Sequence, residues 1–538
     1  MALVDIPLFI IGHSGSMLGV IALSFSIFLL QYAIQSRRPK NFPPGPKGLP
    51  IIGNLHQLPL KKFYLRQTEW SKKYGSIVGF KIGPQNAVVL SSYRHVKEFA
   101  QVLMFMDGRL FDKRGGIYSG RPEQYAGQQI ICPDNIHMLL AQYGPTWRSM
   151  RKAMQGLLNV NAIDALHPIQ LAEATQTMSH LLDDPEGYYD HIRRYSTSVI
   201  LASVYSQRGE SFQSHKVQSL YNSQYRFSRI LEPGATPPID AFPFLRALPE
   251  FLSPWKTEAK EIRQEQSSLY FNLVKETKER RSKHDLEPCF IEKLLDDQEK
   301  NGLNDAQIAY LGGTSMEAGS DTTSAALLTF VLAMTQHPES LKTLQAELDG
   351  VLRWRPVAPA GVPHMLTQDD TYEGYVLPKG TIVFLNTWAI HMDESEYDEP
   401  QKFMPERFMG NKFGCKDQDD SDDHRRITYN FGAGRRVCPG QRLAENSVVR
   451  TLAKKAHKLP DVLIFSQLLN MAKMAWLFDI LPVTSEPVDM SIRSAFTDGV
   501  LIAPHKFPVR FVPRSEQRVN ILQADLKKAK EFFARYKE

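Results

Sequence analysis

The chain has 538 residues, of which 43% are apolar and 23% are charged, so it can bury a large core and is not compositionally disordered. Its formal net charge of +6 is mild, and it has no dense run of lysine and arginine with interleaved aromatic residues. This pattern favours an acidic partner or membrane headgroups and excludes a nucleic-acid signature. The four cysteines have no paired spacing, which argues against a disulfide framework and against a zinc site.

The N-terminal region predicts a membrane anchor. From Met17 to Ile34 the chain is apolar apart from two serines, a glutamine and a tyrosine, which is about long enough to cross a bilayer as a helix. Three basic residues follow within 37–40, whereas the preceding side has Asp5 and no basic residue. The positive-inside rule then places the body of the protein in the cytosol. We therefore expect residues 1–41 to form a luminal N-terminus and a single-pass anchor, with a signal peptide and a buried core helix as alternatives.

The body that follows is expected to be mainly α with a small β-region. A proline-rich segment at 42–50 predicts a stiff linker. Alternating and continuous apolar residues predict strands within 77–90 and again at 381–385. Long amphipathic segments such as 256–283 predict helices, and the final residues, 516–538, read as a charged helix.

One loop carries a specific chemical pattern. It reads F-x-x-G-x-R-x-C-x-G, with Phe431, Gly434, Arg436, Cys438 and Gly440 at the fixed places. The glycines permit backbone with positive φ and let the chain approach a flat ligand closely. Backbone N–H groups in such a loop can hydrogen-bond to sulfur and depress the pKa of the thiol. We therefore expect the cysteine to be a thiolate.

Two further features favour a metal-binding role for Cys438 over that of a small buried hydrophobic residue. The stretch 441–447 looks helical, which would place the sulfur near a helix N-terminus and favour the anion. A thiolate held in this way is the axial ligand that haem iron needs for O–O cleavage. The loop resembles the haem-binding signature of the cytochrome P-450 superfamily.

A second motif agrees with that resemblance. The run Ala318–Thr323 reads A-G-S-D-T-T inside a predicted helix and is similar to the superfamily's oxygen-activation motif. Gly319 costs about 1 kcal/mol relative to alanine within a helix, which suggests a packing or functional reason for it. The hydroxyl and carboxylate beside it can divert the helical hydrogen bonds and open a groove for dioxygen and water. The resemblance implies that Asp321 supplies protons and Thr322 holds oxygen; the alternative is an ordinary solvent-facing helix.

Basic and aromatic residues suit the carboxylates of a haem. Trp147 and Arg151 lie four residues apart on a predicted helix, so they share a face, and the spacing matches the superfamily's W-x-x-x-R. The resemblance implies that Arg436 contacts a second propionate. It also implies that Arg407, in the P-E-R-F segment, stabilises the region before the cysteine loop. Surface salt bridges are the alternative for each arginine.

The resemblance also implies a fold and an activity. We expect the cytochrome P-450 fold over 42–514, preceded by the transmembrane helix and followed by a helical extension at 515–538. The expected enzyme is a monooxygenase with heme b, which inserts one oxygen atom from O2 into a lipophilic substrate. No G-x-G-x-x-G fingerprint for a dinucleotide or flavin is present, so electrons must come from outside the chain. The expected donors are an NADPH–cytochrome P-450 reductase, docking near Arg435 and Arg442, and cytochrome b5. The expected location is the endoplasmic reticulum membrane, and the overall style is similar to fungal members of secondary metabolism.

The chain departs from the superfamily's pattern at three places. The E-x-x-R element keeps Arg353 but has Gly350 where the glutamate belongs, and sequence appears to be missing at the Gly350/Val351 junction. An arginine buried without its carboxylate costs on the order of 3–5 kcal/mol. Residues 100–109 and 449–470 look inserted, and mis-set exon boundaries are our hypothesis for all three places. The alternative functions are therefore a catalytically impaired homologue with weak haem retention, or an isomerase or dehydratase on the same fold.

Overall fold

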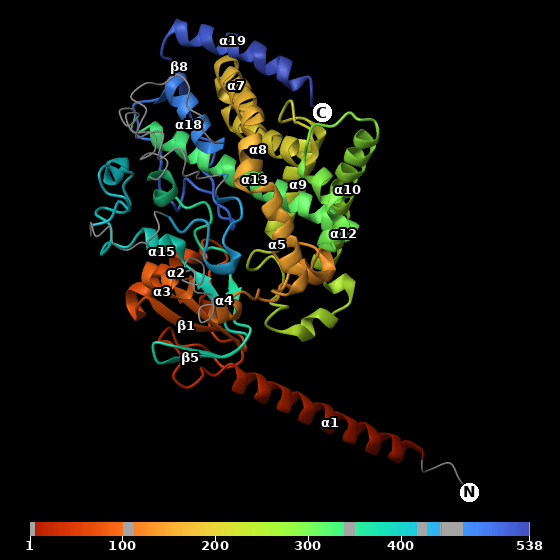
Figure 1. Ribbon diagram of the computed structural model, residues 1–538. Coiled ribbons are helices and arrows are strands. Elements are labelled where there is room, and N and C mark those ends of the chain that lie inside the picture. Colours follow the sequence, from red (N-terminus) through yellow and green to blue (C-terminus); the bar gives the residue numbers. More distant parts are fainter. Residues whose placement is uncertain are drawn as a thin grey trace.

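The computed structural model describes residues 6–100, 112–337, 350–416, 428–441, 443 and 466–536, and within them helices dominate (Figure 1). The helices are α1 Ile6–Gln35, α2 Phe63–Tyr74, α3 Tyr93–Ala100, α4 Asp112–Ile117, α5 Pro145–Leu157, α6 Val160–Ala165, α7 His167–Asp183, α8 Tyr188–Tyr205, α9 His215–Ile230, α10 Pro254–Ser282, α11 Phe290–Asp296, α12 Gln298–Asn301, α13 Asp305–Met334, α15 Thr387–His391, α18 Ser466–Leu477 and α19 Glu516–Phe533. The strands are β1 Ile77–Ile82, β2 Gln85–Leu90, β3 His364–Met365, β4 Asp370–Tyr372, β5 Tyr375–Leu377, β6 Ile382–Leu385, β7 Phe478–Pro482 and β8 Val509–Pro513.

Helix α13 runs through the middle of the helical part, where α8 crosses it (Figure 1). It begins with a capping box. The side chain of Asn304 accepts from the backbone N–H of Gln307, and the side chain of Gln307 accepts from the backbone N–H of Asn304. Most of its side chains are buried, as expected of a helix with neighbours on all sides. Gly319 permits the close crossing, because a Cβ atom there would lie 2.3 Å from Ile200 on α8.

The main sheet confirms the strands expected near residues 77–90 and 381–385. β1 and β2 form an antiparallel hairpin in which Ile77 pairs with Leu90, and β6 adds to β2 in parallel. β3 then pairs with β6 and completes the strand order β1-β2-β6-β3. This β-rich part lies at the end of the molecule next to α1, away from α7 and α19 (Figure 1).

The N-terminal helix α1 projects from the body beside the sheet (Figure 1). Its end is held by Lys81, whose Nζ donates to the carbonyl of Gln35 at 2.7 Å, and by Phe28, whose ring lies 5.4 Å from that of Phe244. Among the described residues, a search for helices sufficiently long and apolar to span a bilayer finds none. The membrane-spanning helix expected in residues 17–34 is therefore not supported by the structure.

The C-terminal helix α19, expected from the sequence, packs along α7 (Figure 1). Beneath it lies a fully buried ion network in which Glu173 contacts Arg194 at 2.5 Å and Arg208 at 3.0 Å. Phe533, at the end of α19, lies over the guanidinium of Arg208 at 3.6 Å. The extension is thus part of the core and shields this network from water.

The three departures from the superfamily's pattern fall mostly beyond what the structure describes. Residues 101–109 of the first expected insertion lie outside the described residues, as do 449–465 of the second. The last five residues of the second insertion, 466–470, form the start of α18. At the third place Gly350 is described and helical, whereas 338–349 are not described.

Candidate functional site

The cysteine loop folds back on itself to present Cys438. The backbone N–H of Cys438 donates to the carbonyl of Phe431 at 2.8 Å, and a short turn spans Gly434–Arg436. Gly434 has φ +67°, as expected for a position that needs glycine. Gly440 has ordinary backbone, but a Cβ atom there would lie 3.7 Å from the sulfur of Cys438. A side chain at that position would thus begin in van der Waals contact with the sulfur.

Helix α5 supports this loop with the two residues predicted from their spacing. Trp147 is buried, and the guanidinium of Arg436 lies 4.4 Å from the centre of its ring. Arg151, one turn further along α5, donates from Nη2 to the carbonyl of Val437 at 2.7 Å. Burial lowers the pKa of Arg151, and the neighbouring Cys438 opposes that shift. The structure thus brings Trp147, Arg151, Arg436 and Cys438 together.

Two further basic residues join this group, and the sequence analysis missed both. Arg121 lies in the loop after α4 and donates from Nη1 to the carbonyl of Pro363 at 2.7 Å. His364, in β3, shares a hydrogen bond between Nδ1 and the carbonyl of Tyr118 at 2.8 Å. Both come from segments with no motif of their own. A basic residue placed between glycine and proline, as Arg121 is, was the available signal.

The basic group carries positive charge that no neighbouring carboxylate of the described residues balances. Burial, together with Arg121 and Arg151, lowers the pKa of Arg436 to about 8, and burial lowers the pKa of Arg121 to about 10. Burial, together with Arg121 and Arg436, lowers the pKa of His364 to about 3. Among the described residues, no carboxylate pairs with Arg121, Arg151 or Arg436. Arg121 is buried, and Arg151 and Arg436 are half-buried. Desolvated cations without a counter-ion are costly, so this group favours a bound anion.

A haem fits these residues. Its iron needs a thiolate, which Cys438 offers at a half-exposed position, and its two propionates are the anions that the arginines lack. Arg436 is fixed by carbonyls, with Nε donating to Ser119 at 3.0 Å and Nη2 donating to Ala141 at 2.7 Å. A cation held in this way is preorganised for a carboxylate.

The motif on α13 lies on an unbroken helix. The hydroxyl of Thr322 donates to the carbonyl of Ala318 at 2.6 Å, in addition to the helix's own bond to that carbonyl. Burial raises the pKa of Asp321, with Glu317 adding to the shift and Arg193 opposing it. Position 319 needs glycine because Ile200 of α8 packs against it, not because a groove opens there. The catalytic roles of Asp321 and Thr322 stay predictions.

Among the described residues, Arg353 is buried without a carboxylate partner, in agreement with the sequence. It is fully buried and donates to the carbonyls of His391 at 2.8 Å, Pro400 at 3.1 Å and Lys402 at 3.4 Å. Its Nε has no partner in the part of the chain that the structure describes. Burial lowers the pKa of Arg353 to about 9, with Arg407 adding to the shift. Backbone carbonyls thus replace only part of what a glutamate would provide.

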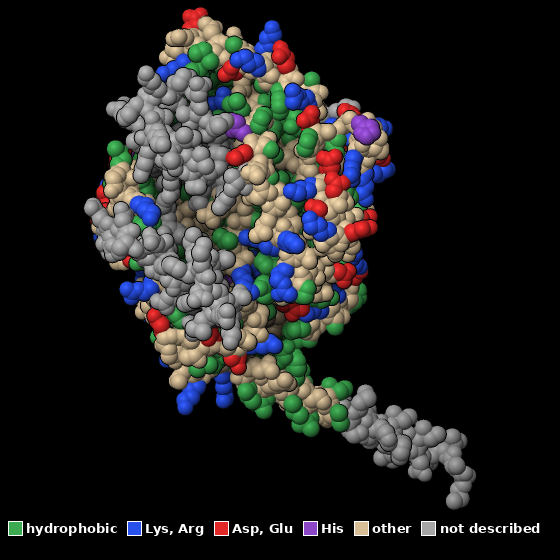
Figure 2. Space-filling view, viewed as in Figure 1, with side chains coloured by type: hydrophobic (Ala, Val, Ile, Leu, Met, Phe, Trp, Pro, Cys, Tyr) green, Lys and Arg blue, Asp and Glu red, His purple; other side chains and the backbone are tan. Residues whose placement is uncertain are grey.

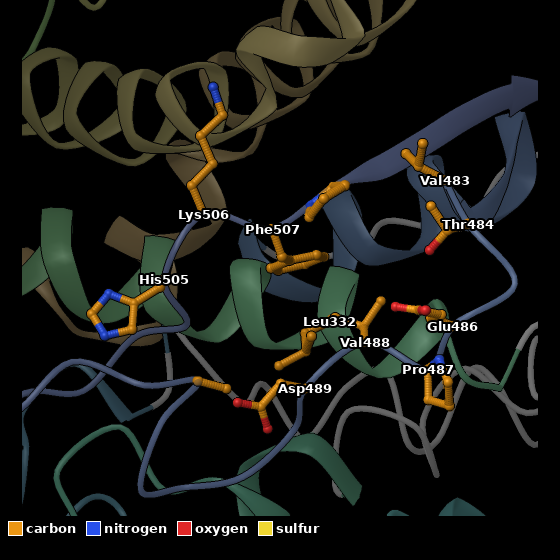
Figure 3. Close-up of a pocket in the computed structure, with 12 residues that line it drawn as sticks. Leu332, Val483, Thr484, Glu486, Pro487, Val488, Asp489, His505, Lys506 and Phe507 are labelled. Atoms are coloured by element: carbon orange, nitrogen blue, oxygen red, sulfur yellow. The ribbon is translucent and has the colours of Figure 1, made fainter.

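A cavity of about 310 Å³ lies elsewhere, beside the C-terminal end of α13 (Figure 3). Its centre is apolar, with Leu332, Val488 and Phe507 close together, and Glu486 and Asp489 stand at its sides (Figure 3). No predicted site residue lines it. It is therefore not the space in front of Cys438.

Comparison with known proteins identifies the class. The family model described as cytochrome P-450 matches residues 43–352 and, separately, 350–454. A cytochrome P-450 monooxygenase of Arthrobotrys oligospora is 33% identical over 95% of this chain and 96% of its own length. The monooxygenases macC of Penicillium terrestre and patH of Penicillium expansum are each 34% identical, over 94% and 91% of this chain and 96% and 93% of their own. A solved zebra fish cytochrome P-450 structure with progesterone has a TM-score of 0.63 and 22% identity, and the match covers 84% of this chain and 99% of that one.

The chain belongs to the cytochrome P-450 family. It is accordingly a haem-thiolate oxidoreductase with cysteine-ligated iron, and Cys438 is the cysteine of the family's loop. The predicted fold class, mainly α with small sheets, is confirmed. The comparisons do not support a catalytically impaired homologue, since the monooxygenases match over nearly the whole chain. The expected domain bounds at 42–514 and 515–538 stay predictions.

Proposed function

We propose that this protein is a monooxygenase that inserts one oxygen atom from O2 into a lipophilic small molecule of fungal secondary metabolism. The observation that carries the proposal is the group of Arg121, Arg151 and Arg436 beside Cys438, which has no carboxylate partner among the described residues. Relatives such as macC, yanC and patH are named as cytochrome P-450 monooxygenases of fungi and support it.

When bound, haem supplies the activation of dioxygen at iron, and the chain's own residues hold the cofactor and supply protons. Cys438 is the iron ligand, and the three arginines neutralise the propionates. The raised pKa of Asp321 means that this carboxyl keeps a proton at higher pH than a free aspartic acid does. Thr322, the next residue, has a hydroxyl that donates to the carbonyl of Ala318.

Electrons are proposed to come from an NADPH-dependent reductase, with cytochrome b5 as a second donor. The chain has no dinucleotide fingerprint of its own. Arg435, in the cysteine loop, is the described part of the basic face proposed for docking, and its guanidinium contacts the hydroxyl of Tyr143. Arg442 lies outside the described residues.

Attachment to the endoplasmic reticulum membrane is proposed through α1, without a claim that this helix crosses the bilayer. The exposed side chains of its described part are mainly hydrophobic (Figure 2). Examples are Val20, Leu23 and Leu30, which are 64%, 63% and 59% exposed. The test is the partition of full-length protein between microsomes and supernatant after carbonate washing; recovery in the supernatant would contradict attachment.

The decisive experiment on function is the spectrum of the reduced, carbon monoxide-treated protein. We expect the band typical of thiolate-ligated haem, its complete loss in Cys438→Ala, and its retention in the control Cys289→Ala, which removes another buried cysteine. Absence of the band in the wild-type protein would contradict the proposed function. Product analysis with a reconstituted reductase and candidate precursors would then identify the substrate.

A further inference from the structure

The cavity beside the C-terminal end of α13 is separate from the space that the proposed function uses. It has a volume of about 310 Å³ and lies mainly between α13 and the segments 483–489 and 505–508. Leu332 is the residue of α13 that lines it, ten residues after Thr322. Ten residues of α-helix span about 15 Å, so a molecule in this cavity would be well away from the oxygen-activation motif.

The walls of this cavity are held by hydrogen bonds to residues on or near two helices. The backbone N–H of Phe507 donates to the hydroxyl of Tyr188 on α8 at 3.0 Å, and that hydroxyl donates to the carbonyl of Phe507 at 3.0 Å. Nε2 of Gln336, two residues beyond α13, donates to the carbonyl of Val488 at 3.3 Å. The cavity is therefore a preformed part of the fold, as binding sites for small molecules usually are.

The centre of the cavity suits an apolar group. Leu332, Val488 and Phe507 lie together there (Figure 3). Leu332 is buried, whereas Val488 and Phe507 are half-buried and keep apolar surface that a ligand could cover. Removing such surface from water is favourable, and an aromatic ring such as that of Phe507 also attracts an organic cation that lies against its face.

Two carboxylates give the sides of the cavity a negative charge. Glu486 and Asp489 stand there, and both side chains are exposed (Figure 3). Asp489 accepts from the hydroxyl of Ser494 at 2.5 Å and from the backbone N–H of Ser491 at 2.8 Å. These two hydrogen bonds lower the pKa of Asp489, so it is ionised at neutral pH.

The basic residues of the cavity do not neutralise this charge by pairing. Lys506 and His505 line the cavity, but their side chains extend away from its apolar centre (Figure 3). In the part of the chain that the structure describes, neither Glu486 nor Asp489 forms an ion pair. A positively charged ligand group is therefore the electrostatic complement of this cavity.

We propose that this cavity is a second binding site, which takes a small amphiphilic organic cation. The apolar part of the ligand packs against Leu332, Val488 and Phe507, and its positive nitrogen lies towards Glu486 and Asp489. The two carboxylates repel an anion of the same shape. Because these carboxylates are exposed and screened by water and salt, we expect binding in the millimolar range.

The test compares benzyltrimethylammonium with 4-toluenesulfonate, two probes of similar size and opposite charge, by isothermal titration calorimetry on the holoprotein. The quaternary nitrogen has no lone pair, so the ammonium probe cannot ligate haem iron. We expect it to bind about tenfold or more tightly than the sulfonate, because both carboxylates favour the cation. Glu486→Gln should weaken its binding about fourfold, the effect of one unit charge at about 4–5 Å in water. Val488→Phe fills the centre and should weaken it about tenfold through lost apolar contact.

The matched control is Glu531→Gln, which removes an exposed glutamate of α19 that does not line the cavity and should bind both probes as the wild-type protein does. Saturation with 4-phenylimidazole, whose ring nitrogen can ligate haem iron, should leave binding of the ammonium probe unchanged. The proposal is overturned if the ammonium probe does not bind at millimolar concentration, or if the sulfonate binds as tightly. It is also overturned if Glu486→Gln or Val488→Phe leaves the affinity unchanged, or if 4-phenylimidazole displaces the probe, which would place it in front of Cys438.

Discussion

Two groups of arginines in this protein have no carboxylate partner among the described residues, and the groups differ in what would satisfy them. The first, beside Cys438, combines Arg121, Arg151 and Arg436 from three distant segments. The second centres on Arg353, which is enclosed by carbonyls of the segment 391–402. In the first group the missing anion is the cofactor's, whereas in the second it is a side chain that the chain itself does not supply at position 350.

The two groups differ in whether a ligand can reach the arginines, and this accessibility distinguishes a binding site from a buried charge that lacks a partner. The arginines beside Cys438 donate to carbonyls, and Arg121 and Arg151 add to the lowering of the Arg436 pKa by burial, as expected where a ligand will later bring negative charge. Arg353 is sealed at 0% exposure, and its Nε is without a partner in the described residues, so no ligand can reach it. The break between the two segments matched by the family model, 43–352 and 350–454, falls at this same point.

The largest effect is expected from a substitution in the group beside Cys438. Arg436→Gln removes the central cation, so haem content after expression should fall by about tenfold or more, since a charge-assisted hydrogen bond contributes about 1.5–3 kcal/mol. The measurement is the ratio of Soret to protein absorbance in purified samples. Arg435→Gln, which alters the neighbouring residue on the same turn, is the matched control and should retain haem. Equal haem content in both variants would contradict the assignment.

The next largest effect is expected from a substitution that supplies Arg353 with a carboxylate. Gly350→Glu restores a carboxylate three residues before Arg353, on a face where a Cβ atom lies 3.2 Å from Phe403. The free energy of unfolding in denaturant should rise by about 2 kcal/mol, from a charged hydrogen bond to a buried guanidinium. Gly350→Gln carries the same shape without charge and separates this gain from helix propensity. If the two variants are equally stable, the missing glutamate is not what Arg353 lacks.

The smallest effect is a pH dependence that distinguishes the two groups. Each holds a histidine whose pKa is lowered to about 3, His364 by burial, Arg121 and Arg436, and His391 by burial and Arg353. Because the unfolded chain protonates these residues near pH 6.5 and the folded chain does not, stability falls as pH drops from 6.5 towards 3. Each histidine contributes a slope of about 1.4 kcal/mol per pH unit.

Haem should remove only one of these two contributions. Propionates beside Arg121 and Arg436 would raise the pKa of His364, whereas His391 is unaffected. The slope between pH 6 and 4.5 should therefore be smaller in the haem-bound protein than in the haem-free protein, by about 1.4 kcal/mol per pH unit. Urea unfolding across this range measures it. In His364→Gln the slopes with and without haem should coincide, and a persisting difference would place the propionates elsewhere.

Features of this protein that depend on local sequence patterns could be predicted, whereas features that depend on contacts between distant segments could not. Cys438 and its loop, and the shared face of Trp147 and Arg151, depend on spacings of a few residues, so the sequence alone sufficed. Arg121 and His364 could not be found in this way, because their partners are hundreds of residues away. Gly319 shows the same limit, since its packing partner Ile200 is on another helix.

The C-terminal helix α19 has a consequence for how the chain is made. Phe533 closes the buried network of Glu173 and Arg208, yet it is synthesised long after both of them. Until it leaves the ribosome, α7 and α8 expose both their apolar contact face and a charged network that is built to be dry. The packing of this part of the enzyme therefore waits until α19 has been synthesised, and a chain truncated before α19 would be a target for quality control.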